Sequence, residues 1–437
     1  MPMDFDDTMK MVTSDSVNSN TSSESSESAD SAIVGSTLTD RSVYITTWRE
    51  FLKYELIDQF SPVYFVGFLG CGITGNILYE FPYPAKWLQI CGIIMHCLTL
   101  VLFLATTALL VLSCWHYPER ITRYHYDPSV SIFMGVYSMG FTTIVNGVHY
   151  LLNGKYPIFV WVLWWIGVFM AVYNATFIFY FSFLSKLNEH KLKDMNSTIF
   201  LPIVCPCVVS SSGNLVAMTL TNPNHRVVTS IASFMLLCVS LVLYHGLGAI
   251  YMARLVLVKI PDTYQIFTMF LPIGFLGQSS YSIMLFGTNM YDFIPDKTLA
   301  SSLFFPCALF AMCLLAGGYI FTFLAIISTL SKIKPFARNL NPEITGYGLI
   351  KWNKGYWTMT FPLGTMSLGN IEISRSIGLI PGGFELKFFK VFSCMFSVAV
   401  VIICLINLVG MADHIWRTVR KTLYQQHSRV VIEVDKV

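Results

Sequence analysis

Long apolar stretches recur along the chain from about residue 60 to residue 416, and short polar connections separate them. A helix of roughly 20 apolar residues crosses a bilayer core about 30 Å thick, so each stretch is long enough to span a membrane. The predicted fold is an all-α integral membrane protein with ten transmembrane helices in five helical hairpins. The ten predicted spans are residues 60–79, 87–114, 128–151, 157–184, 198–221, 227–253, 263–289, 298–330, 355–373 and 388–416.

The predicted spans fall into two alternating classes. The odd-numbered spans hold twenty Gly and Pro residues against nine in the even-numbered spans, although the odd-numbered spans are shorter. The even-numbered spans are more uniformly apolar, as in the run Leu-Thr-Leu-Val-Leu-Phe-Leu at 98–104. Helix breakers at membrane depth are tolerated where they are buried in protein or line a cavity. We therefore expect the odd-numbered helices to line a central pore and the even-numbered helices to face lipid or neighbouring subunits.

Each odd-numbered span repeats one local pattern, in which a helix breaker and small residues precede a carboxamide or lie beside it. Five occurrences in strict alternation indicate an internal repeat of helix hairpins. Small residues also allow helices merely to pack closely, but close packing gives no reason for the even-numbered spans to lack the pattern. The candidate pore-lining and anion-binding residues are Gly72, Thr74, Asn76, Thr142, Asn146, Ser210, Ser211, Asn214, Gln278, Ser279, Gly364, Thr365, Ser367 and Asn370.

The middle of this predicted path contains no Lys or Arg. Conduction needs a site that binds an ion weakly enough to release it. Hydroxyl groups, carboxamides and backbone N–H groups near the helix breaks could solvate an anion without trapping it. They could also solvate a neutral or cationic solute, so the residue types alone leave the sign of the charge open.

Phe361 is the candidate gate of the path. Pro362 follows it, which biases Phe361 away from helical dihedral angles and removes one backbone hydrogen bond. A ring at such a break, in a span otherwise rich in small residues, could project into the path and close it by excluding water. The alternative is an ordinary packed aromatic side chain.

Ionisable groups within the spans are functional candidates because they are costly there. Glu372 could carry a proton, or it could pair with Arg375, since positions three residues apart share one helix face. We expect the ion pair. His96, His149 and His245 could relay protons, but a histidine in a helix more often satisfies a local hydrogen bond.

Composition excludes several classes of protein. The chain is 54% hydrophobic and 12% charged, with a mean hydropathy of +0.59, which is outside the range of an ordinary soluble domain. The two thiols of Cys205 and Cys207, with no His nearby, fall short of a metal-ligand set. We expect no metal, cofactor or nucleic-acid partner. No ATP-binding loop is present by motif. We also expect that the protein is not an enzyme, since residues that could act as nucleophile, base and metal ligands do not cluster in the sequence. A receptor would have little binding surface outside the bundle.

The distribution of charge predicts the topology and the terminal segments. Connections after even-numbered spans hold twelve Lys and Arg residues against six after odd-numbered spans, which places the former connections and both termini in the cytoplasm. Residues 1–44 are rich in Ser and acidic residues and predict a disordered cytoplasmic tail, either solvating or regulated by phosphorylation. We expect an interfacial amphipathic helix at 45–58, the transport domain at 59–416 and a basic cytoplasmic tail at 417–437.

Four segments resemble the tellurite-resistance and dicarboxylate transporter family, which includes plant slow anion channels and fungal malate permeases. They are residues 75–88, 139–146, 277–280 and 354–370, and the resemblance extends from about residue 58 to 416. It implies ten helices in five hairpins, a pore lined by the odd-numbered helices, and a phenylalanine on the ninth helix that occludes it, at the position of Phe361. Relatives form trimers, which implies a homotrimer embedded in the lipid bilayer.

Within this family the sequence is most similar to the sulfite efflux pumps of fungal plasma membranes. That resemblance implies export of a small inorganic anion, sulfite or bisulfite, across the plasma membrane. The alternatives are a proton-coupled permease for C4-dicarboxylates such as malate and a general anion channel of the same fold. A dicarboxylate clamp would be expected to use Arg, which binds carboxylates in a bidentate manner, and the absence of Arg from the middle of the path favours the small anion.

Overall fold

The computed structural model describes residues 57–58, 60–333, 352–380 and 383–434. The expected N-terminal tail, and the amphipathic segment except Ile57 and Asp58, lie outside these residues. Within the described residues the chain is helical and has no strand. The predicted basic tail begins inside the last helix, α13 (Lys387–Val434), which continues well past the expected end of the last span.

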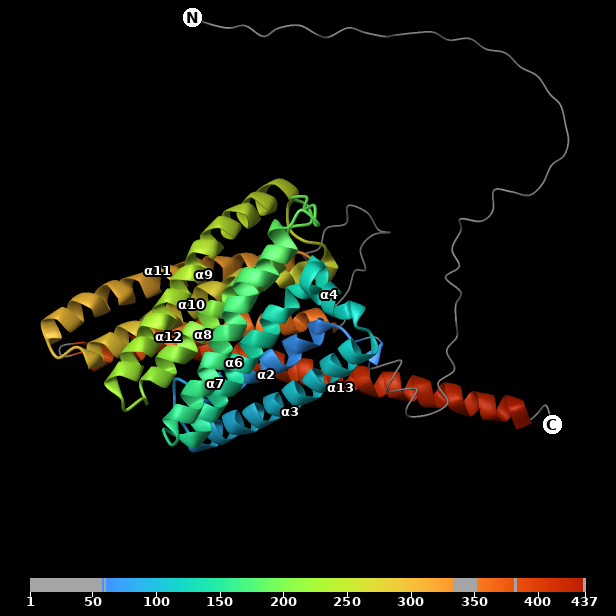
Figure 1. Ribbon diagram of the computed structural model, residues 1–437, viewed down its shortest axis with the longest axis horizontal. Coiled ribbons are helices and arrows are strands. Elements are labelled where there is room, and N and C mark those ends of the chain that lie inside the picture. Colours follow the sequence, from blue (N-terminus) through green and yellow to red (C-terminus); the bar gives the residue numbers. More distant parts are fainter. Residues whose placement is uncertain (1–56, 59, 334–351, 381–382, 435–437) are drawn as a thin grey trace, which may run out of the picture. The chain divides into compact units, whose positions relative to one another are not determined.

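Five helices, which correspond to the odd-numbered predicted spans, form a closed inner ring. Figure 1 views the helices from the side, as they run across the picture. Each packs against the next one in chain order, and the last packs back against the first. We call them the inner helices. They are α2 (Phe65–Tyr79), α6 (Phe133–Leu152), α8 (Leu201–Ala217), α10 (Leu271–Phe293) and α12 (Thr360–Leu379).

Five outer helices complete the hairpins and surround the inner ring. Each packs against the inner helix that precedes it in the chain and also against the next inner helix of the ring. They are α3 (Lys86–His116), α7 (Pro157–Tyr173), α9 (Pro223–Val258), α11 (Lys297–Leu330) and α13, and the π-helical turns η3 (Asn174–Ile178) and η4 (Tyr180–Leu184) extend α7. The predicted arrangement, with the odd-numbered helices inside and the even-numbered helices outside, is confirmed.

Short helices connect the hairpins or lead into the inner helices. η2 precedes α2, η5 precedes α8, η6 precedes α10 and η7 precedes α12, while α4 and α5 lie between α3 and α6. Their bounds are η2 (Pro62–Tyr64), α4 (Glu119–Tyr126), α5 (Pro128–Ser131), η5 (Ser197–Phe200), η6 (Thr263–Phe270) and η7 (Lys354–Met359).

The two classes of helix differ sharply in burial. In the most apolar window of each membrane-length segment, between 67 and 94% of the residues are buried for four inner segments, against 11 to 39% for the five outer segments. Those are nine segments of the described chain that are long and apolar enough to cross a bilayer. The count of ten expected from the sequence is not reached, because α12 carries too many polar residues.

The position of α12 explains how it tolerates these polar residues. α2 and α10 flank it in the ring, and α11 and α13 cover its outer side. Residues 360–371 are all buried by the rest of the protein. Its hydroxyl and amide groups therefore find partners within the protein, and the helix does not need the apolar surface that lipid contact demands.

Glycine allows the inner helices to approach one another closely. A Cβ atom on Gly72 of α2 would overlap the side chain of Thr143 on α6. A Cβ atom on Gly364 of α12 would lie 2.5 Å from Cγ1 of Ile73 on α2, far inside van der Waals contact. Gly72 and Gly364 were both predicted to line the path, and these contacts give them a packing role at the α2–α6 and α2–α12 interfaces.

Side-chain caps fix where two of the outer helices begin. Asn222 accepts a hydrogen bond from the backbone N–H of Asn224 at 2.9 Å, and Pro223 occupies the first turn of α9. Asp296 accepts from the N–H of Thr298 at 2.9 Å at the start of α11. Both caps satisfy backbone donors that the first turn of a helix leaves free. The hairpin connections can therefore be short.

Replacing Gly72 with Val is expected to destabilise the protein by about 1–3 kcal/mol, the usual range for overpacking a tight interior. The added side chain must displace Thr143 or separate α2 from α6. Thermal unfolding of the purified protein in detergent measures the effect. Gly246→Val is the matched control, since Gly246 is exposed on α9 and a Cβ atom there would have no neighbouring atom within 4 Å. Equal melting temperatures for both variants would contradict the tight α2–α6 contact.

Candidate functional site

A cavity of about 780 Å³ opens at the end of the ring where the inner helices α2, α8, α10 and α12 begin. We call it the vestibule. Side chains from all five inner helices line its deeper part: Val66, Leu69, Val136, Met139, Leu201, Val204, Leu271, Phe361 and Pro362. The mouth is more polar and includes His190, Asp194, Asn196, Gln265 and Lys354. The vestibule therefore has a polar mouth and an apolar inner surface.

Phe361 lies at this apolar surface. Its residue is only 7% exposed, and it lines the vestibule together with Pro362 on the first turn of α12. The ring rests against α10, where a Cβ atom on Gly274 would lie 3.3 Å from Cδ1 of Phe361. Gly274 thus leaves room for the ring between the two helices. The gating role predicted for Phe361 stays a prediction, and its place at the vestibule surface is compatible with that role.

Farther along the inner helices, two hydrogen bonds join three of them through amide and hydroxyl groups. Ser212 of α8 donates to Oδ1 of Asn146 on α6 at 2.6 Å, and Nε2 of Gln278 on α10 donates to the hydroxyl of Ser211 on α8. On α2, Oδ1 of Asn76 is buried and has no hydrogen-bond partner. Two adjacent serines of α8 thus hold Asn146 of α6 and Gln278 of α10, one each, and Asn76 presents an unsatisfied amide oxygen.

Three further predicted residues lie between α8 and its neighbours. Ser210 donates to the backbone oxygen of Ser233 on the outer helix α9 at 2.5 Å and contacts Ser282 of α10 at 2.6 Å. Asn214 donates to the backbone oxygen of Ser282 at 3.5 Å, and Ser279 lies 3.2 Å from Sγ of Cys207. These polar groups join α8 to α9 and α10, so each already has a partner inside the protein.

The three predicted threonines bond to their own helices. Thr74 donates to the backbone oxygen of Gly70 at 2.8 Å, Thr142 to that of Ser138 at 3.0 Å, and Thr365 to that of Pro362 at 2.8 Å. Such bonds satisfy a buried hydroxyl without a partner from another helix. Each hydroxyl proton is used in this bond. The oxygen can still accept a hydrogen bond, but the hydroxyl cannot donate one to an anion.

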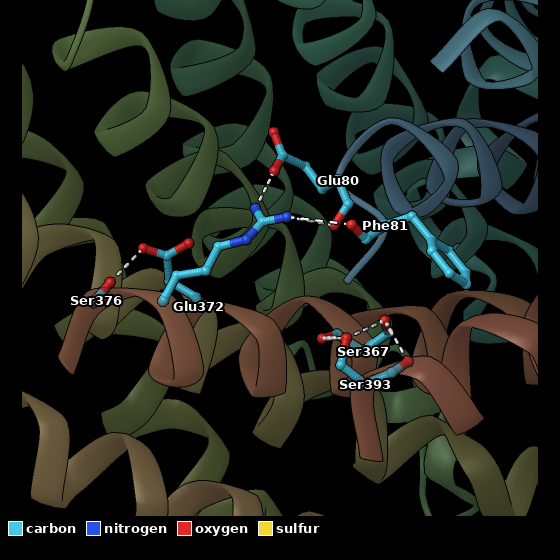
Figure 2. Close-up of polar contacts among 7 residues, drawn as sticks. Glu80, Phe81, Ser367, Glu372, Ser376 and Ser393 are labelled. Atoms are coloured by element: carbon cyan, nitrogen blue, oxygen red, sulfur yellow. Dashed lines mark hydrogen bonds and ion pairs between the residues drawn. The ribbon is translucent and has the colours of Figure 1, made fainter. Parts of the chain in front are cut away.

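Ser367 and Asn370 contact the outer helices. The hydroxyl of Ser367 lies 2.6 Å from that of Ser397 and 3.1 Å from that of Ser393, both on α13 (Figure 2 shows Ser367 and Ser393). Oδ1 of Asn370 accepts from the Tyr319 hydroxyl of α11 at 2.5 Å. These contacts stabilise the α12 interfaces with α13 and α11, and they are on the outward side of α12.

Charged residues gather at the opposite end of the ring, which we call the far end. Nη1 of Arg375 donates to Oε2 of Glu80, and Nη2 donates to the backbone oxygens of Glu80 at 3.0 Å and Phe81 at 3.4 Å (Figure 2). Oε1 of Glu372 instead accepts from the Ser376 hydroxyl at 2.7 Å. The expectation that Glu372 pairs with Arg375 is wrong. Arg375 pairs with Glu80 instead, because the Glu80 carboxylate at the end of α2 lies within reach of the guanidinium.

The sequence did not single out three tyrosines, Tyr79, Tyr150 and Tyr281, as a group. The rings of Tyr79 and Tyr150 stack with centroids 4.2 Å apart, and the residues of Tyr150 and Tyr281 are 6 and 5% exposed. They come from three inner helices, α2, α6 and α10. A tyrosine in an apolar span resembles any other packed aromatic residue, so only the fold brings these three together.

The structure also corrects the expectation for His96, whose two ring nitrogens are buried with no hydrogen-bond partner. The ring extends from α3 between Gly75 of α2 and Gly147 of α6, where Cβ atoms would lie 2.9 Å from Nε2 and 2.6 Å from Nδ1. His245 does satisfy a local bond, with Nδ1 2.6 Å from the backbone oxygen of Leu241.

Comparison with known proteins agrees with this architecture. Residues 59–412 match the SLAC1 family, described as voltage-dependent anion channel. The sulfite efflux pump SSU1 of Candida albicans is 43% identical over 384 residues, covering 87% of this chain and 79% of that protein. The SSU1 pump of Saccharomyces cerevisiae is 31% identical, and the match covers 73% of this chain and 80% of that pump. The SSU1 pump of Arthroderma benhamiae is 27% identical, and the match covers 79% of this chain and 88% of that pump.

The match covers most of the chain, and it coincides with the part of the structure that forms the ring and its outer helices. Helical hairpins with a central ring, a vestibule and a membrane-length apolar surface are also what an anion channel of this kind requires. The chain belongs to the SLAC1 family of voltage-dependent anion channels.

Proposed function

We propose that this protein exports sulfite, as bisulfite or the dianion, across the plasma membrane through the centre of the inner ring. One observation carries the proposal: in the described chain, the inner helices hold a single Lys or Arg, Arg375 at the far end. Between the vestibule and that residue lie amides, hydroxyls and backbone groups. An anion therefore meets polar groups that solvate it, with no fixed cation to retain it midway.

The amide and hydroxyl network on α6, α8 and α10 is the proposed place of solvation. Amide N–H groups of Asn76, Asn146 and Gln278 are the proposed donors. The hydroxyl of Ser211 donates to the backbone oxygen of Val208 at 2.8 Å and accepts from Gln278, so its role is to position the Gln278 amide. Ser367 and Asn370 are left out of this proposal, because their hydrogen bonds are directed toward outer helices. The SSU1 relatives are named sulfite efflux pumps, which supports sulfite as the anion.

An inside-negative membrane potential supplies the driving force. Moving one negative charge outward is favoured by about 2.3 kcal/mol per 100 mV, or roughly 50-fold at equilibrium. Export therefore needs no ATP hydrolysis. Phe361 is proposed to close the path, because an apolar ring at the inner surface of the vestibule disfavours a continuous column of water.

The vestibule is proposed to face the cytoplasm, because the connections that surround its mouth are the more basic set in the sequence. The charged groups at the mouth are of both signs and include Lys354, Glu189 and Asp194. The subunit number implied by the resemblance, three, stays a prediction. The outer helices carry the large apolar side chains that such an assembly or the lipid would cover.

Phe361→Ala is expected to raise anion conductance at least several-fold, since it removes the apolar ring from the vestibule surface. Electrical recording in liposomes that contain the purified protein, with sulfite as the main anion, measures the effect. Phe286→Ala is the control, because Phe286 is on the same ring of helices but stacks on Phe234 of α9, with centroids 4.7 Å apart. Unchanged conductance in a well-folded Phe361→Ala protein would remove the gate from the proposal.

Malate is expected to compete weakly with sulfite, because the described inner helices offer no pair of cations for its two carboxylates. Sulfite flux into or out of proteoliposomes, measured with rising malate at constant ionic strength, checks this expectation. Strong inhibition, together with malate flux coupled to protons, would favour the dicarboxylate permease. Equal flux of sulfite, nitrate and chloride would favour a general anion channel.

The orientation predicts which epitopes antibodies reach in intact cells. An epitope attached to the C-terminus should be detected only after permeabilisation, because Asn407 of α13 bonds to Trp352 at the vestibule end. An epitope inserted after Gly154, in the α6–α7 connection at the far end, should be detected without permeabilisation. The reverse pattern would place the vestibule outside the cell and invert the direction of the gate.

A further inference from the structure

Arg375 occupies a singular position in the inner ring. Phe361 and Arg375 are 14 residues apart on α12 (375 − 361), or about 21 Å along the axis at 1.5 Å per residue. Phe361 lines the vestibule, so Arg375 is at the opposite end of the same helix. In the described chain it is the one guanidinium or ammonium group on any inner helix. An anion that leaves the vestibule and traverses the ring therefore meets no fixed positive charge before this end.

The guanidinium is already occupied by an anion of the protein itself. Both Nη groups donate to Glu80 and its backbone, and Nη2 also donates to the Phe81 carbonyl oxygen (Figure 2). The Glu80 carboxylate uses one oxygen, Oε2, on Nη1, whereas Nη2 bonds only backbone oxygens. An oxygen of sulfite or bisulfite could accept from the same Nη1 group. Glu80 thus has the geometry of a competitor for the same donors.

Glu80 is also placed so that it can leave. It is the residue that ends α2, at the start of the connection to α3, and its side chain is 24% exposed against 36% for that of Arg375. The pair is therefore in contact with water, and separating it exposes no fully buried charge. A rotation of the Glu80 side chain toward solvent would release the Nη1 donor of Arg375, while Nη2 would stay on the backbone oxygens of Glu80 and Phe81.

Glu372 makes the site weak toward anions. Its carboxylate is one turn before Arg375 on α12, and Ser376 holds it through a bond of 2.7 Å, while Thr288 of α10 donates to Ser376 at 3.0 Å. Glu372 is thus a second acidic side chain at the far end, beside the pair of Glu80 and Arg375. In its ionised form Glu372 would repel an oxyanion held by Arg375, which shortens the stay of that anion.

We propose that Arg375 is an exit-side binding site for a small oxyanion, and that Glu80 occupies this site as an internal competitor when no anion is passing. The inference rests on the proposed function, since it assumes that an anion crosses the ring. The arriving anion exchanges with the Glu80 carboxylate on the guanidinium, and the return of Glu80, aided by Glu372, displaces it outward. No covalent bond changes in this exchange.

Arg375 and Glu80 form one ion pair, but in this proposal Arg375 binds the anion and Glu80 competes with it. Substitutions of the two residues should therefore change sulfite affinity in opposite directions. The purified full-length protein is titrated with sodium sulfite in detergent, and the rise in melting temperature gives the apparent affinity. Sodium gluconate at matched ionic strength corrects for salt. Glu80→Gln, which removes the competitor, is expected to bind sulfite about tenfold more tightly, which corresponds to about 1.4 kcal/mol. Arg375→Gln is expected to bind it at least tenfold more weakly.

A contact that only holds the fold would respond differently. Both substitutions break the same ion pair, so a purely structural role would shift sulfite affinity in one direction, or not at all, and either result would overturn the proposal. Glu80→Asp, which keeps the charge but shortens the side chain, should lie between wild type and Glu80→Gln and serves if the latter does not fold. Glu385→Gln is the control, because Glu385 pairs with Lys390 at 2.6 Å on an exposed surface, and it should match wild type.

The test separates this inference from the choice of substrate. If proteoliposomes show that the protein carries nitrate or chloride and not sulfite, the proposed substrate is wrong, and the same titration is made with the anion that is carried. Opposite shifts for Glu80→Gln and Arg375→Gln with that anion would still establish the exit site. Shifts of the same sign would reject the exit site, whichever anion is carried.

Discussion

The close approach of five inner helices is the constraint on which the structure depends. Glycine at the α2–α6 and α2–α12 contacts allows backbones to come near enough for the ring to close. Without that closure the hydroxyls and amides of the inner helices would face lipid, where an unsatisfied polar group costs several kcal/mol. The outer helices shield the ring by placing apolar side chains between it and the bilayer. The polar interior and the apolar exterior both follow from the close packing of the inner helices.

The closed ring also separates three chemical environments along its axis. The vestibule surface is apolar near Phe361, the middle joins α6, α8 and α10 through amide and hydroxyl groups, and the far end carries the charged groups. An ion that moves from the vestibule along the axis passes neutral dipoles before it meets the charged groups of the far end. This order allows passage without a deep energy well, which is a general requirement for rapid conduction.

The sequence predicted the layering of this fold because membrane helices must satisfy two strong demands, apolar length and internal satisfaction of polar groups. Glycine, proline and carboxamides in alternate spans therefore indicated the inner helices, and the structure confirms this. The count of spans was harder to predict, since α12 is enclosed by protein and escapes the demand for apolar surface. Its polar residues were assigned to the path, yet Ser367 and Asn370 bond to outer helices, because helix periodicity alone does not fix rotation about the axis.

Contacts between distant segments were the part that the sequence did not determine. Glu372 and Arg375 are one turn apart on one helix, but Glu80 approaches from α2 only after the ring closes. His96 likewise lies in a space that Gly75 and Gly147 leave between helices. Spacing along a helix predicts neighbours on that helix, whereas partners on other helices depend on the tertiary arrangement.

Phe361 and Arg375 share a single helix, and this has a mechanical consequence. Fourteen residues at 3.6 per turn bring them back to within about 40° of each other around the axis of α12. A rigid rotation of α12 must therefore swing both side chains the same way, so the two ends of the path would loosen or tighten in concert. Independent control of the ends requires α12 to flex between them, and Gly364 and Gly369 are the residues in that interval with the least resistance to bending.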